Sequence, residues 1–184
     1  MSVMLASLAA APEEVPIWSG GFVNRAICCG LLPGLAMLLV PRLRPPRFLL
    51  TVVMTMVYSG LMGMVSDVQY AWLARVFGDN ASFLTLVQKT LFDQFVVAVL
   101  WNGPLNALFY AWAGNGFRRG FVAAHGGYRA FFRAVYLPII VFNWLIWIPI
   151  MLGVYAFPQV WQITVSGLAC TVWILLCLFF GRKK

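Results

Sequence analysis

Five long apolar segments, separated by short polar connections, constrain the fold of this chain more than any other feature of its sequence. They are Phe22–Val40, Leu49–Trp72, Leu91–Ala113, Ala134–Leu152 and Gln159–Phe180. Each approaches the roughly 20 residues that a helix needs to cross a membrane. Charged residues make up 10% of the chain, against about 25% in soluble domains. The sequence therefore predicts an all-α fold, a multi-pass transmembrane helical bundle of five spanning helices.

The segment boundaries divide the chain into one domain and two tails. We expect an exposed N-terminal tail over residues 1–21, a single transmembrane bundle over 22–180 and a basic tail over 181–184. The first residues lack the basic start of a secretory signal peptide and the arginines of a mitochondrial presequence. We therefore interpret them as a tail and not as a targeting segment.

The basic residues predict how the bundle is oriented. Ten of the thirteen lie in the first connection, the third connection or the C-terminal tail: Arg42, Arg44, Arg47, Arg118, Arg119, Arg129, Arg133, Arg182, Lys183 and Lys184. With five spans these regions share one side, and basic loops mark the cytoplasmic side. We expect the N-terminus outside and the C-terminus inside. Because the net charge of +8 has this membrane explanation, we do not expect nucleic-acid binding.

A four-span arrangement is the alternative. If the last segment lay on the membrane surface, the tail of Arg182, Lys183 and Lys184 would move to the other side and the charge pattern would be lost. The last segment carries no charge between Trp161 and Phe180, which favours a spanning helix.

Polar side chains interrupt the apolar segments, and seven of them are the candidate site residues. They are Asp67, Lys89, Asp93, Gln94, Asn102, Asn106 and Asn143. Polar and ionisable groups within a membrane are costly, so they face the protein interior or a wet cavity. We therefore predict that these residues line a pore or lock helices together.

Lys89 and Asp93 stand four residues apart at the start of the third segment. Residues with this spacing share one helix face, so the two charges can neutralise each other. One interpretation is an anchor at the membrane interface. The other is that Asp93 and Gln94 hold another helix or line a wet cavity.

Pro104 lies between Asn102 and Asn106 in the same segment. Proline leaves the carbonyl four residues earlier, that of Leu100, without its helical partner. In lipid such a group needs a partner from protein or water, so we expect this region to face the interior.

Residues of the second segment recur in steps of four. They are Thr51, Thr55, Ser59, Gly63 and Asp67. Small residues at this spacing favour close helix packing over a pore lining. The carboxylate of Asp67 needs a further explanation, and Arg25, Arg75 and Lys89 are its candidate partners.

Catalytic and metal-binding motifs are missing from the sequence. It contains no nucleophile elbow, P-loop or metalloprotease motif. Four cysteines form no ligand-like spacing, and His125 is the single histidine. We predict no enzyme activity, no cofactor and no metal.

Several motifs together resemble the family of small peroxisomal membrane proteins, which also includes a mitochondrial inner-membrane protein of mitochondrial DNA maintenance. The pattern K-x-x-x-D-Q is matched by Lys89, Asp93 and Gln94. Further matches are Gly63, Tyr70, Leu73 and Arg75, then Pro138, Asn143 and Pro149, and finally Trp173. Departures from the family pattern are Met64, Gln69, Ala74, Val99 and Leu137, and Asn143 is displaced by one position from the asparagine of the family.

The resemblance covers residues 47–180 and is closest to bacterial members. It implies channel-like or metabolite-passing behaviour, and family members are usually drawn with four spans. It favours a bacterial inner membrane, with the mitochondrial inner and peroxisomal membranes as alternatives.

The functional expectation is therefore channel- or transporter-like passage of small hydrophilic solutes or ions. The rival expectation is a non-conducting membrane scaffold whose polar groups only lock helices. Expected partners are membrane lipids, an unidentified small solute or ion and, as an open alternative, further copies of the chain.

Overall fold

A computed structural model describes residues 20–45 and 47–180, with the side chains of 177–180 left out, and shows five helical spans. The first span consists of α2 (Gly20–Arg25), η1 (Ala26–Leu31) and α3 (Leu32–Leu39), and the second is α4 (Phe48–Phe77). The third consists of α5 (Phe83–Phe92), η3 (Asp93–Asn102) and α6 (Gly103–Gly114). The fourth consists of α7 (Tyr128–Phe131), η5 (Phe132–Tyr136) and α8 (Leu137–Ala156), and the fifth is α9 (Gln159–Phe180). Two short 3₁₀ turns, η2 (Pro41–Leu43) and η4 (Ala123–His125), lie in the connections. The described residues form no strand, so the predicted all-α bundle with five candidate spans is confirmed.

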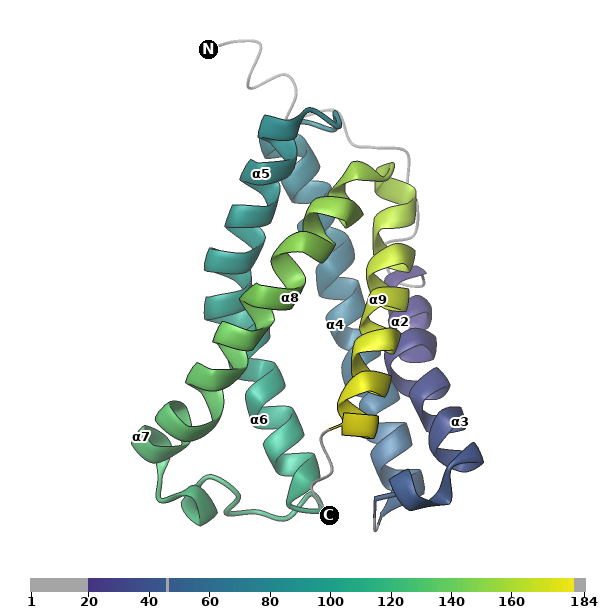
Figure 1. Ribbon diagram of the computed structural model, residues 1–184, viewed down its shortest axis with the longest axis vertical. Coiled ribbons are helices and arrows are strands. Elements are labelled where there is room, and N and C mark those ends of the chain that lie inside the picture. Colours follow the sequence, from purple (N-terminus) through teal and green to yellow (C-terminus); the bar gives the residue numbers. More distant parts are fainter. Residues whose placement is uncertain (1–19, 46, 181–184) are drawn as a thin grey trace.

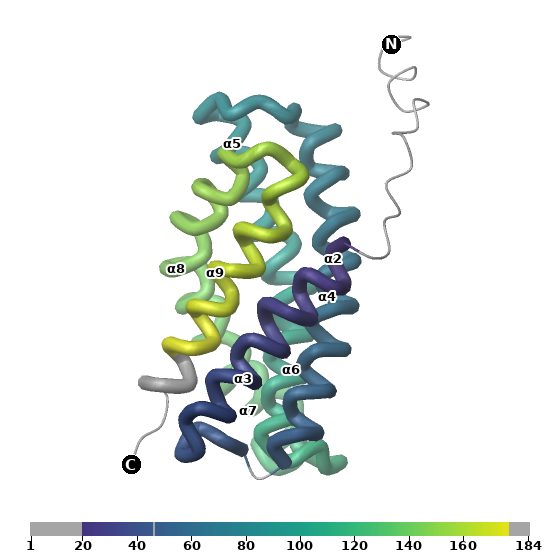
Figure 2. The backbone as a smooth tube through the Cα atoms, turned by 90° about the vertical axis from the view of Figure 1, so that its right-hand side faces the viewer, coloured from purple at the N-terminus to yellow at the C-terminus, as the bar shows by residue number. Residues whose placement is uncertain are grey.

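The helices form one elongated bundle in which spans that are consecutive in the sequence run in opposite directions (Figure 1). The first span, α2 to α3, packs against α4, and α9 packs against both of them. On the other side α5 and η3 pack against α8, which crosses the bundle obliquely in front of α4. Figure 2 shows α9 lying alongside α2 and α3. The first and last spans are thus neighbours although about 140 residues separate their contacts.

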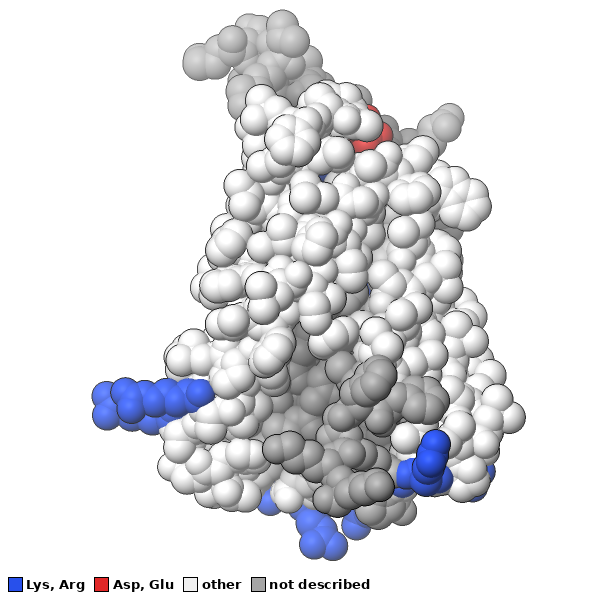
Figure 3. Space-filling model, viewed as in Figure 1, with Lys and Arg blue, Asp and Glu red and all other residues white. Residues whose placement is uncertain are grey.

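Most of the outer surface is apolar. Large hydrophobic side chains on the outside of every span are exposed, including Val57, Leu100, Leu145 and Val172. In Figure 3 the visible basic side chains gather toward the lower end, where η2, α7 and the loop before α7 lie. The 30 residues of α4 give a helix of about 45 Å, close to the thickness of a bilayer with its headgroups. The surface and the length both suit a membrane.

The expected tails lie largely outside the described residues. Residues 1–19 and 181–184, with Arg182, Lys183 and Lys184, are not described. Gly20 and Gly21, which we assigned to the N-terminal tail, are helical in α2. Gly21 is buried against α4, so at these two positions the predicted boundary is wrong.

The third and fourth spans begin several residues earlier than their apolar segments do. The third starts at Phe83 and not at Leu91, because Ser82 caps the helix and accepts a hydrogen bond from the Thr85 amide at 3.3 Å. The fourth starts at Tyr128, after Gly126 and Gly127, whose positive φ angles end the loop. Lys89 therefore lies inside a helix and not at its start.

Each π-helical stretch in the described chain ends two residues before a proline. These stretches are η1, η3 and η5, followed by Pro33, Pro104 and Pro138. Proline has no N–H group, and its ring clashes with the carbonyl four residues earlier. A π turn pairs each amide with the carbonyl five residues earlier, as the bond from Gly103 to Ala98 shows. The wider turn thus accommodates the ring.

The π register also decides which carbonyl lacks a backbone partner. Five residues before Pro104 is Val99, and the Tyr136 hydroxyl donates to its carbonyl at 2.6 Å. Five residues before Pro33 is Cys28, and the Thr171 hydroxyl donates to that carbonyl. From the sequence, the carbonyl without a helical partner was predicted to be that of Leu100, on the assumption that the whole segment is α-helical. In the π register the amide that Pro104 lacks would have paired with Val99, one residue before Leu100.

Removing the hydroxyl of Tyr136 is expected to destabilise the bundle. In the Tyr136→Phe variant the Val99 carbonyl loses its donor, which costs about 1–3 kcal/mol for a buried polar group. The measurement is the free energy of unfolding in detergent micelles. Tyr128→Phe is the matched control, because Tyr128 is 79% exposed and should change little. Equal stability of the two variants would contradict this role of Tyr136.

Candidate functional site

The centre of the candidate site is a chain of hydrogen bonds between three spans, here called the Asp93 cluster: Gln69, Asp93, Gln94 and Asn143. The Asp93 carboxylate accepts bonds from the Gln69 amide of α4 and, at 2.8 Å, from the Gln94 amide. Gln94 in turn accepts a bond from Asn143 of α8 at 2.8 Å. Asp93 and Gln94 are each 4% exposed. The carboxylate is therefore held by amide donors in the interior of the bundle.

Neighbouring groups fix the position of Gln94. The Trp144 indole donates to the Gln94 carbonyl at 2.9 Å, and the Trp144 ring packs on Phe95. Gln94 is thus bonded through both its side chain and its backbone. Since its amide oxygen already accepts from Asn143, the orientation of the Gln94 amide toward Asp93 is determined.

Lys89 does not pair with Asp93, and the predicted ion pair is wrong. The Lys89 ammonium lies 3.8 Å from the carboxylate of Asp79, in the loop before α5. Helical side chains lean toward the N-terminus of their helix, so the long Lys89 side chain extends toward that loop. It is 1% exposed and approaches the Tyr155 ring at 5.9 Å. Lys89 is a buried cation beside the Asp93 cluster and not a member of it.

A second group of polar contacts, the Arg25 cluster, consists of Asn24, Arg25, Thr164 and Ser166. The Arg25 guanidinium donates to the Ser166 hydroxyl at 3.0 Å, and the Asn24 amide donates to the Thr164 hydroxyl at 3.0 Å. Both bonds join α2 to α9. From the sequence, Arg25 was expected only as a candidate partner for Asp67. The sequence feature that could have identified Arg25 as a site residue is its position as a lone arginine inside an apolar segment.

Tyr70 connects the two clusters. It is 5% exposed, and its hydroxyl lies beside Ser166 and Arg25, with Asp93 near enough to act on it electrostatically. Its ring meets the Tyr155 ring edge to face, with 5.6 Å between centroids. Polar groups from all five spans thus follow one another through this part of the bundle.

The remaining predicted residues lie elsewhere. Asp67 is half-buried and its carboxylate contacts the backbone of Gly21; it makes no ion pair within the described residues. Asn106 accepts a bond from the Tyr58 hydroxyl at 2.7 Å. Asn102 is half-buried, and its side chain has no hydrogen bond to another described residue. The structure therefore brings Asp93, Gln94 and Asn143 together and places Asp67, Asn102 and Asn106 outside their network.

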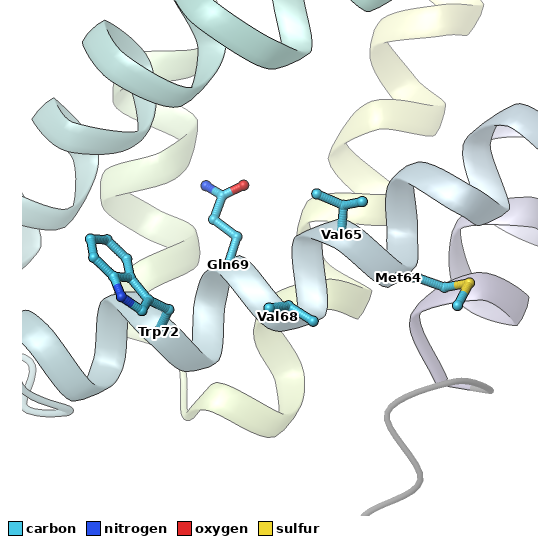
Figure 4. Close-up of a pocket in the computed structure, with 5 residues that line it drawn as sticks. All are labelled: Met64, Val65, Val68, Gln69 and Trp72. Carbon is cyan, nitrogen blue, oxygen red and sulfur yellow. The ribbon is translucent and has the colours of Figure 1, made fainter. Parts of the chain in front are cut away.

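One edge of the Asp93 cluster reaches the outer surface. Gln69 is the polar member of a groove of about 440 Å³ on α4, which is otherwise lined by Met64, Val65, Val68 and Trp72. In Figure 4 the Gln69 side chain points away from α4, toward the helices that face it. The Asp93 cluster therefore reaches the apolar exterior through the side chain of Gln69.

Several buried polar atoms near the clusters have no hydrogen-bond partner among the described residues. They are Asn24 Oδ1, Arg25 Nε, Thr90 Oγ1, Tyr155 Oη and Gln162 Oε1. Gln162 and Ser166 stand four residues apart on α9, and Thr90 follows Lys89 on α5. Buried polar groups in proteins are nearly always bonded to protein or to ordered water. These atoms therefore mark interior positions where water or a polar solute can bind.

The fold and the site together define the structural class of this protein. The chain is an all-α bundle whose described part contains five helices long and apolar enough to cross a membrane, around an interior of hydrogen-bonded polar groups. Within the described residues no three histidine, cysteine or acidic side chains converge as metal ligands. Comparison with protein-family models, with curated proteins and with solved structures found no match.

Proposed function

We propose that this protein passes small hydrophilic solutes or ions across a bilayer through its polar interior. The observation that carries the proposal is a set of five buried polar atoms, two of them in the Arg25 cluster, that have no hydrogen-bond partner within the described residues. In a scaffold without interior water, each of these atoms would stay unsatisfied and would cost about 1–3 kcal/mol of stability. Groups that bind water or solute recover that cost.

The charges along this interior suggest how it acts on a solute. Asp93 is held by two amides whose hydrogen bonds a passing solute can replace. Lys89, four residues before Asp93 in the same span, is a buried cation, and Arg25 of the first span is a half-buried one. Ionisable groups in this setting commonly mark solute or ion pathways. Asp93 and Gln94 would gate the route, and the two cations would bias it by charge.

The setting of the proposal is a bacterial inner membrane, with the N-terminus outside and the C-terminus inside. It is supported by the described arginines at one end of the bundle and by the resemblance to small peroxisomal membrane proteins. The proposal includes no enzyme activity, no cofactor and no nucleic acid.

Purified full-length protein in liposomes tests the proposal. We expect release of entrapped potassium and of small hydrophilic dyes above the rate of empty liposomes. Gly153→Ala is a suitable control variant, because this glycine is exposed on α8 and has open space around it. Release equal to that of empty liposomes, for protein that is shown to be folded and inserted, would contradict the proposal.

A second candidate function is a non-conducting scaffold. The observation that favours it is that the hydrogen bonds of both clusters join different spans: Gln69 to Asp93, Asn143 to Gln94, and Arg25 to Ser166. Such bonds lock helices together in lipid. Substitutions of Asp93 by asparagine and by leucine distinguish the two functions.

A further inference from the structure

A groove of about 540 Å³ lies between α6 and the start of the fourth span. Its apolar lining comes from both sides and includes Pro104, Ala107 and Leu108 of α6 and Phe131 and Phe132 of the facing helix. The groove is at the end of the bundle where α7 lies (Figure 1). It is separate from the Asp93 and Arg25 clusters, which share none of its lining residues.

Two arginines line the same groove. Arg129 and Arg133 stand four residues apart on the helix that begins at Tyr128, and both are exposed. At this spacing two side chains lie on the same face of a helix. Basic side chains project over the position of α7 in Figure 3. The groove therefore combines an apolar floor with two cations along its edge.

Neither guanidinium has a partner within the described residues. No carboxylate there lies within ion-pair distance of Arg129 or Arg133, and neither makes a hydrogen bond to a described group. The described acids are Asp67, Asp79 and Asp93, which all belong to the upper part of the bundle. The two positive charges are thus free to bind an anion.

We propose that this groove binds an anionic phospholipid, with its phosphate on Arg129 and Arg133 and an acyl chain along Phe132 and Leu108. The partner follows from the chemistry of the groove. Arginine binds phosphate through paired N–H groups, and basic pockets between membrane helices hold acidic lipid headgroups. The apolar floor runs onto the apolar outer surface of the bundle, where lipid chains lie. A small soluble anion has no apolar group that could contact the apolar floor of the groove.

Native mass spectrometry of the full chain in detergent tests the proposal. The probes are dioleoyl phosphatidylglycerol, dioleoyl phosphatidylcholine and inorganic phosphate. We expect the phosphatidylglycerol to bind more tightly than the phosphatidylcholine. The double variant Arg129→Gln with Arg133→Gln should weaken phosphatidylglycerol binding on the order of 30-fold, as two surface cations contribute, and leave phosphatidylcholine binding unchanged.

The matched control is the double variant Arg118→Gln with Arg119→Gln. These arginines are exposed in the connection just before that helix but do not line the groove, so the net charge changes equally and affinity should change less than threefold. Equal loss in both double variants would overturn the proposal, because it would show attraction by general charge. Equal binding of the two lipids by the unmodified chain would also overturn it. So would displacement of phosphatidylglycerol by equimolar inorganic phosphate, which would indicate a phosphate site without a lipid chain.

Discussion

Replacing Asp93 by asparagine is expected to change solute selectivity while leaving the bundle as stable as before. The new amide can accept from Gln94 through its oxygen and donate to Gln69, whose own amide rotates to present an oxygen. Every hydrogen bond of the Asp93 cluster is then kept and only the charge is lost. The free energy of unfolding should stay within about 1 kcal/mol, the net value of one hydrogen bond.

The loss of charge should nevertheless alter passage. Lys89 and Arg25 remain as the cations of this region, so the ratio of cation to anion flux in liposomes should fall. A change on the order of tenfold corresponds to about 1.4 kcal/mol of electrostatic energy, a modest effect for a buried charge. Unchanged selectivity in a stable, conducting Asp93→Asn variant would exclude Asp93 from the route.

The companion variant Asp93→Leu removes the acceptor as well as the charge. Gln69 and Gln94 then keep buried amide donors without partners. We expect a loss of about 2–6 kcal/mol, because each of these two groups costs about 1–3 kcal/mol when it is left unsatisfied. A scaffold predicts that Asp93→Leu unfolds and that Asp93→Asn behaves as the unmodified chain. A solute route predicts an effect of Asp93→Asn on flux without an effect on stability. The pair of variants therefore distinguishes the two functions.

Adding one methyl group at Gly63 is expected to destabilise the bundle by about 2 kcal/mol or more, at the upper end of overpacking effects. Gly63 of α4 and Gly21 of α2 are both buried and face each other. A Cβ atom at Gly63 would overlap the Gly21 carbonyl and come within 2.7 Å of the Arg25 Cγ atom. The Gly21 carbonyl belongs to the backbone, so α2 must move away from α4.

Gly153→Ala is the matched control for Gly63→Ala. Gly153 is also helical, but a Cβ atom there meets no atom within 4 Å. The better helix propensity of alanine should make this variant neutral or more stable by up to about 1 kcal/mol. Thermal unfolding in detergent compares the two. If Gly63→Ala were as stable as Gly153→Ala, the close approach of the first two spans would be disproved.

The prediction for the small residues of the second segment illustrates what sequence patterns determine well. Ser59 and Gly63 were expected to pack against a helix, and both are buried in α4 on the side that faces the first span. Asp67 lies one turn further, against Gly21. The residue type and its helical spacing were sufficient here, because close packing needs small side chains on one face.

The position of the polar groups was predicted only in part. That Asp93, Gln94 and Asn143 are partly or fully buried follows from the cost of exposing them to lipid. Their partners do not follow. Gln69 was considered only as a departure from a family pattern, yet its amide binds Asp93. Lys89 was assigned to Asp93 by spacing, and the structure pairs it with Asp79.

The sequence by itself determined the five spans, their alternating direction and the apolar exterior. These properties depend on local composition, since any segment of sufficient length and hydropathy must form its own backbone hydrogen bonds in lipid. Only the tertiary structure decided that Arg25 meets Ser166, that Tyr136 serves the Val99 carbonyl and that Gln69 holds Asp93. These contacts depend on how each helix is rotated and at what depth it packs. Side chains from different spans together determine the rotation and depth of each helix. The hydropathy of the sequence does not predict either of them.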